Sequence, residues 1–132
     1  MFYVEGVIDS IELEVSSPKL KQFSIVPSSE FLITLPDGKK RVLFIDYEEK
    51  VSTTDDSARN GAFLHETKKN KNDKDVIYFK AKQPFTSTVI DILIQSKYNH
   101  SSVRVWTRQW KDERNNAVQH PCIDDVIEIH FV

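Results

Sequence analysis

The sequence predicts a mainly β fold: a β-rich α+β domain built as one small antiparallel barrel or sandwich, with one helix near residues 86–98. Three observations lead to this prediction. Short runs of alternating apolar and polar residues recur along the chain, and such alternation is typical of half-buried strands. Polar segments with turn-forming residues separate these runs. One longer run is apolar on both parities, which favours a helix over a strand with one solvated face.

Length and composition indicate one globular domain covering residues 1–132. A chain of 132 residues can build one substantial core but is too short for two ordinary domains. With 29% charged and 39% hydrophobic residues, the composition is that of a water-soluble protein. No apolar run approaches the roughly 20 residues that a membrane-spanning helix needs, so no membrane association is expected.

The single cysteine, Cys122, excludes an internal disulfide framework and fits a reducing compartment. The first residues lack a basic segment followed by an apolar one, so the sequence shows no signal peptide, unless one was removed. We therefore expect a cytoplasmic protein. The formal charge of −2 counts mildly against nucleic-acid binding, since such proteins often carry a basic excess, but it leaves a local basic face open.

The longest predicted strand runs from Phe2 to Val15 and should be bent. Its apolar residues share one parity as far as Ile8 and the other parity from Ile11 onward. Successive side chains of a strand point to opposite faces, so this switch requires a bulge or a sharp bend, at Gly6 or at Asp9-Ser10. A long bent strand can serve both sheets of a small barrel.

Seven further strands are predicted, at residues 22–26, 31–35, 41–47, 62–65, 76–81, 103–110 and 123–132. The segment from Leu35 to Lys40 reads Leu-Pro-Asp-Gly-Lys-Lys and is the strongest hairpin signal, because Pro followed by Asp-Gly favours a tight reversal. A turn is predicted at 16–19. Residues 48–61 and 66–75 are predicted to be long polar loops, and 68–75 should be solvated because it contains no apolar residue.

The segment from Pro84 to Lys97 has two interpretations. As a helix it places Phe85, Val89 and Leu93 on one face, with a cap among residues 86–88 at its start and Asn99 at its end. As a strand it has alternating β-branched residues. We favour the helix because the run is apolar on both parities and lies between turn signals.

The order of elements is a long bent strand, a hairpin, a strand, a helix, a strand and a final strand. This order resembles that of the oligonucleotide/oligosaccharide-binding (OB) barrel, and the predicted fold is therefore OB-like. The resemblance concerns element order alone and does not by itself imply a function.

The strand at 103–110 is the first candidate binding surface. If Val103 and Val105 face the core, the opposite face carries two arginines and two tryptophans: Arg104, Trp106, Arg108 and Trp110. Guanidinium groups and indoles on a sheet can stack on bases, at about 1–3 kcal/mol per base, or on a sugar ring, or anchor a protein interface. The alternative is that the indoles are covered and the arginines lie along the surface.

A second candidate surface is formed by Tyr78, Lys80 and Lys82, which share one side of their strand. If this strand pairs with the strand at 103–110, the two surfaces join into one basic and aromatic face. Otherwise these lysines are ordinary solvated side chains.

No catalytic residue, metal ligand or cofactor is predicted. The histidines are scattered, and His120–Asp125 contains ligand types without the paired spacing of a structural zinc site. The chain has three glycines and neither a Gly-rich phosphate loop nor a Gly-x-Ser-x-Gly nucleophile turn.

The leading functional prediction is a non-catalytic binding module that recognises a protein or other macromolecule through a sheet face and its long polar loops. The alternatives are a single-stranded nucleic-acid binder and a small enzyme with an unrecognised site. The expected partner is a protein or a second copy of the chain, with nucleic acid second.

Overall fold

The computed structural model describes residues 1–15, 19–47, 62–111, 113–114 and 117–132. Its strands, in chain order, are β1 (Phe2–Leu13), β2 (Leu20–Pro27), β3 (Leu32–Thr34), β4 (Lys40–Asp46), β5 (Ala62–Glu66), β6 (Lys68–Lys69), β7 (Asp75–Lys80), β8 (Val103–Lys111) and β9 (Ala117–Phe131). A short 3-10 helix, η1 (Ser29–Phe31), precedes β3, and the helix α1 (Ser87–Asn99) lies between β7 and β8. Residues 16–18 of the turn predicted at 16–19, and the whole loop predicted at 48–61, lie outside the described residues.

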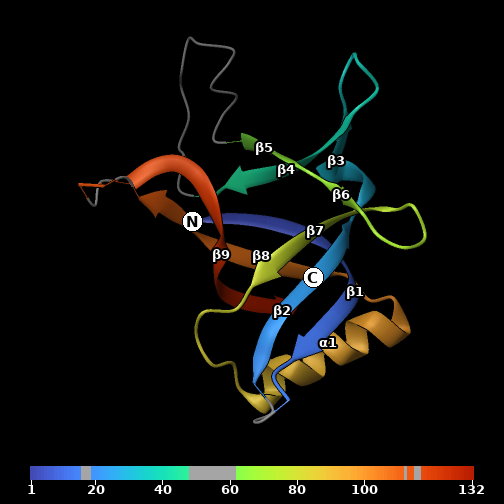
Figure 1. The fold of residues 1–132 in the computed structure, drawn as a ribbon, viewed down its shortest axis with the longest axis vertical. Helices are drawn as coiled ribbons and strands as arrows, with labels where there is room; N and C mark the ends of the chain where they lie inside the picture. The colour runs from blue at the N-terminus through green and yellow to red at the C-terminus, as the bar shows by residue number, and fades with distance from the viewer. Residues whose placement is uncertain (16–18, 48–61, 112, 115–116) are drawn as a thin grey trace.

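Five strands form an antiparallel sheet, in the order β7–β2–β1–β8–β9, that curls into a half-barrel (Figure 1). Its two ends are joined by a side chain, because the Gln83 Nε2 group beyond β7 donates a hydrogen bond of 3.1 Å to the Val126 carbonyl in β9. The predicted fold class, mainly β with one helix, is confirmed. The curled sheet is consistent with the small-barrel, OB-like class.

The core lies inside this curl and consists of the inward-facing apolar side chains of the strands and one side of α1. Full burial of such a side chain stabilises the fold by about 1.5–3 kcal/mol. The largest fully buried residues are Phe2, Phe23, Phe44, Phe79, Leu20, Ile25, Leu93, Val4, Val42, Val76, Val103 and Val105.

Strand β1 is bent as predicted and pairs with different partners along its length. Residues 2–6 pair with β8, whereas residues 6–13 pair with β2. The register with β2 shifts between Ile8 and Ser10, which places the predicted bulge at Asp9. The bulge lets Ile8 and Ile11 both turn toward the core, although they have opposite parity.

The helical interpretation of the apolar run is confirmed by α1. The Thr86 hydroxyl accepts a hydrogen bond from the Val89 amide at 3.4 Å and caps the first turn. The predicted face is the buried one, with Leu93 and Ser96 fully covered. The helix ends at Asn99, and its C-terminal cap is His100, one residue later than the predicted cap at Asn99; the left-handed backbone of His100 (φ 55°) terminates the helix.

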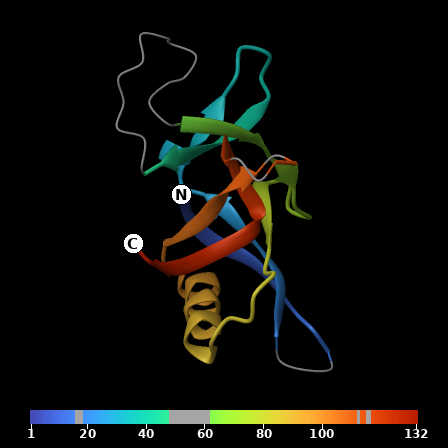
Figure 2. The same ribbon diagram turned by 90° about the vertical axis from the view of Figure 1, so that its left-hand side faces the viewer.

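The segment between β2 and β7 contains η1 and the strands β3, β4, β5 and β6, and we call the first three of these strands the β3–β5 arm. The arm lies at the opposite end of the molecule from α1 (Figure 2). Its hairpin confirms the predicted reversal: Gly38 has φ 85°, and the Leu35 amide donates to the Lys39 carbonyl at 2.8 Å. Strand β4 also pairs with the start of β1, which attaches the arm to the half-barrel.

The prediction of a loop throughout residues 66–75 is wrong. Residues 68–69 form β6, which pairs with the start of β7, and only the five residues between them form a turn. The Asn70 side chain orders this turn, since its Oδ1 accepts hydrogen bonds from the Asn72 and Lys74 amides at 2.8 and 2.9 Å. Within the described ranges, no helix is both long and apolar enough to cross a membrane.

Candidate functional site

The first candidate surface was predicted from the register of β8, and that register is confirmed. Val103 and Val105 are fully buried in the core. The alternate residues of this part of the strand therefore point to the outer face of the sheet.

Trp106 lies on that outer face, but its indole is only 9% exposed, so the expectation of an open stacking surface at this residue is wrong. The rings of Tyr3 and Tyr47 cover it, with centroids at 4.9 and 5.4 Å. Its Nε1 group donates a 2.9 Å hydrogen bond to Nε2 of His130. An indole can only donate, so Nε2 accepts, and the proton of the neutral imidazole lies on Nδ1, which faces the Phe131 carbonyl at 3.0 Å.

Arg104 is also engaged within the molecule. Its guanidinium group forms an ion pair with Glu5, with Nε 2.7 Å and the terminal nitrogen 2.5 Å from the same carboxylate oxygen. The guanidinium lies 4.3 Å from the centre of the Tyr3 ring, a cation–π geometry. A ligand that binds at Arg104 would have to replace the ion pair with Glu5 and the contact with the Tyr3 ring.

Arg108 and Trp110 continue β8 beyond a break in its pairing. The register with β9 shifts twice between Trp106 and Gln109. Arg108 is exposed and pairs with Asp125 at 3.2 Å. Trp110 is 58% exposed, with the His120 ring at 6.3 Å. The four predicted residues therefore do not form one continuous stacking surface.

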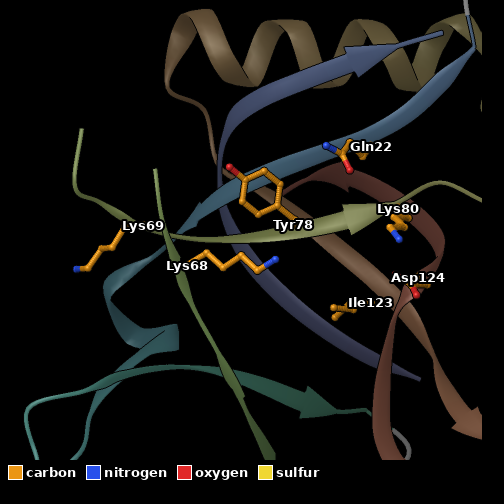
Figure 3. A pocket seen from close by; sticks show the side chains of 7 residues that line it. All are labelled: Gln22, Lys68, Lys69, Tyr78, Lys80, Ile123 and Asp124. Carbon is orange, nitrogen blue, oxygen red and sulfur yellow. The ribbon is translucent and has the colours of Figure 1, made fainter. Parts of the chain in front are cut away.

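The second candidate surface lies on the outer face of β2 and β7 and contains an open groove of about 520 Å³. Alternation along β7 explains its position: Ile77 and Phe79 are buried in the core, and Tyr78 and Lys80 point outward. We call this groove, lined by Gln22, Lys68, Lys69, Tyr78, Lys80, Ile123 and Asp124, the basic groove (Figure 3).

The basic groove brings together residues from four strands. Gln22 of β2 lies directly opposite Lys80 of β7. The Lys68 ammonium is 5.9 Å from the centre of the Tyr78 ring. Within the part of the chain that the structure describes, the Lys80 ammonium has no ion pair or hydrogen-bond partner. Lys82, predicted with Tyr78 and Lys80, is exposed beyond the end of β7 and does not line the groove.

Strand β7 pairs with β2 and β6, not with β8, so the two predicted surfaces do not join. Lys68, Lys69 and Gln22 were not predicted as site residues. The missed signal is the polar Asn and Asp cluster at residues 70–73, which is typical of a hairpin turn and would have placed the preceding lysines beside β7.

The chemistry of the groove is that of an anion-binding surface. Its lining contains three lysines and one carboxylate residue, Asp124, and the ammonium of one of the three, Lys69, is paired with Asp75. A phenol ring and an amide can add stacking and hydrogen bonds. Among the described residues, no three His, Cys, Asp or Glu side chains gather so as to hold a metal ion. Comparisons with protein families, curated proteins and solved structures find no match to this chain.

Proposed function

We propose that this protein is a non-catalytic binding module that holds single-stranded nucleic acid in the basic groove. The observation that carries the proposal is the position of the Lys68 ammonium beside the Tyr78 ring, with Lys80 further along the same groove, on the outer face of a curled antiparallel sheet (Figure 3). OB barrels bind oligonucleotides on the equivalent kind of surface, on the second and third strands of the barrel.

The two kinds of side chain match the two parts of a nucleotide chain. Ammonium groups neutralise phosphates and release condensed counterions, which supplies most of the sequence-independent affinity. A single-stranded chain leaves its bases unpaired, and an aromatic ring such as Tyr78 can stack on one of them. A double helix hides its base faces, so the proposal is specific to single strands.

The sequence alone favours a protein partner, because long polar loops on a rigid scaffold commonly carry recognition. The structure weakens this argument, since residues 68–69 of one such loop form β6. In addition, Trp106 and Arg104, which could anchor a protein interface, are occupied by contacts within the molecule. We therefore rank nucleic acid above a protein partner. We place the activity in the cytoplasm, as the cysteine content indicates, and self-association through strand edges stays a prediction.

The test is binding of a fluorescent oligothymidylate, measured by fluorescence anisotropy at several salt concentrations. Tyr78→Leu should weaken binding by about 1–3 kcal/mol, the contribution of one stacked base. Tyr78→Phe should bind like the wild type, because it keeps the ring. Lys80→Ala should weaken binding and make the salt dependence less steep by about 0.7, the contribution of one phosphate contact on a single strand.

Lys111→Ala is the matched control, since Lys111 is exposed on β8 and does not line the groove. It should leave the affinity close to that of the wild type. Equal binding by Tyr78→Leu and Tyr78→Phe would reject base stacking. Equally tight, salt-sensitive binding of polyglutamate would show that the groove recognises acidic chains, including acidic proteins, rather than nucleic acid.

A further inference from the structure

A second hollow, of about 330 Å³, adjoins the basic groove on the side of the β3–β5 arm. It is lined by the turn of the β3–β4 hairpin and by the segment that joins β5 to β6. Its lining residues are Gly38, Lys39, Lys40, Arg41, Glu66, Thr67, Lys69 and Asp75. Lys69 therefore lines both hollows.

Successive side chains of a strand point to opposite faces, which explains how Lys68 of β6 lines only the basic groove whereas Lys69 also lines the second hollow. Figure 3 shows Lys68 pointing toward the side of Tyr78 and Lys69 pointing the other way. The Lys69 ammonium is held by Asp75, with Nζ 3.1 Å from the carboxylate. The boundary between the basic groove and the second hollow is thus formed by Lys69, whose ammonium would exchange Asp75 for a phosphate where an anionic chain crosses it.

Positive charge is concentrated in the lining of the basic groove and the second hollow. Six of the 18 lysines and arginines line the two hollows, against three of the 20 carboxylates. Their lining carries a formal net charge of +3, and the rest of the chain carries −5. This local excess of positive charge attracts an extended anion to the two hollows together.

The second hollow also has cations that can reach a ligand. Within the described part of the chain, the Lys39 ammonium has no ion pair or hydrogen-bond partner. Lys40 donates to the hydroxyl of Thr34 at 2.9 Å, a neutral partner that a phosphate can replace. Arg41 is half-buried and pairs with Glu66 at 3.7 Å.

We infer that single-stranded nucleic acid continues from the basic groove across Lys69 into the second hollow, where the β3–β4 turn contacts its phosphates through Lys39 and Lys40. The β3–β5 arm, inserted between two strands of the half-barrel, thereby lengthens the binding site. This inference rests on the proposed function and adds to it the path and extent of the ligand.

The test compares oligothymidylates of about 4 and about 16 nucleotides, which span the site sizes of small barrel domains. The wild type should bind the longer one more tightly. Lys39→Ala/Lys40→Ala should bind the longer oligonucleotide about fivefold more weakly, with a salt dependence less steep by about 1.4, or about 0.7 for each lost phosphate contact. Its affinity for the short one should be unchanged.

Lys97→Ala/Lys111→Ala is the matched control, because it removes the same charge from outside both hollows. An equal loss in this control would overturn the inference, since the effect would then be one of net charge alone. Wild-type affinity and salt dependence in Lys39→Ala/Lys40→Ala would also overturn it, while a loss in Tyr78→Leu would still support the basic groove. Failure of the wild type to bind either oligonucleotide would reject the proposed function itself.

Discussion

At the scale of single residues, the two tryptophans occupy different environments on one strand. Trp106 is covered by rings from β1 and from beyond β4, and its N–H is satisfied by His130. A largely covered indole needs such a partner, because leaving its N–H unpaired costs free energy. Trp110 has more than half of its surface in solvent. The same side chain thus stabilises the fold at one position and stays accessible at the other.

Fluorescence quenching can check this difference directly. Trp110→Phe leaves Trp106 as the only indole, and acrylamide should quench it weakly. Trp106→Phe leaves Trp110, which should be quenched several-fold more efficiently. Acrylamide is preferred to iodide because it is uncharged, and the nearby Arg104 guanidinium would attract an anion. Equal quenching of the two variants would contradict the burial of Trp106.

At the scale of elements, helix and strand are joined by one buried hydroxyl. Ser96 of α1 is fully buried; its Oγ accepts a hydrogen bond from the Ile8 amide at 3.0 Å and donates one to the Ser101 carbonyl at 2.6 Å. The pairing of β1 with β8 ends at Gly6, two residues before Ile8. The hydroxyl therefore supplies the partner that the sheet does not.

Ser96→Ala should lower the free energy of unfolding by about 1–3 kcal/mol for each buried polar group left without a partner. Gln95→Ala is the control, since Gln95 is exposed on the same helix, and its effect should stay within about 0.5 kcal/mol. Urea unfolding followed by circular dichroism measures both. Equal unfolding midpoints for the two variants would show that the Ser96 hydroxyl does not stabilise the packing of α1 against β1.

Local patterns predicted the elements well, because their causes are local. The Thr86 cap, the Asp-Gly turn and the parity switch in β1 are each encoded within a few neighbouring residues. The pairing of strands is not encoded in this way. The sequence around Arg104 does not indicate that its partner is Glu5, 99 residues away. The sequence of β7 likewise does not indicate that its neighbour in the sheet is β2. The candidate site was therefore predicted in part, through Tyr78 and Lys80, without the lysines of β6.

At the scale of the whole molecule, the small net charge does not reflect the local concentration of positive charge in the two hollows. The formal charge of −2 argues mildly against a nucleic-acid ligand, but the lining of the two hollows is cationic. This local excess of positive charge would direct a polyanion to this face. Such binding should be strongly weakened by added salt, since screening acts on exposed charges.

The central claim is that the outer face of β2 and β7 is the ligand-binding surface. Its most direct test is an NMR titration of the isotope-labelled protein with an oligothymidylate at low salt, following each backbone amide. We predict that the largest shifts occur at Gln22, Lys69, Tyr78 and Lys80. Shifts concentrated instead around Trp106 and His130, or no shifts at all, would contradict the claim.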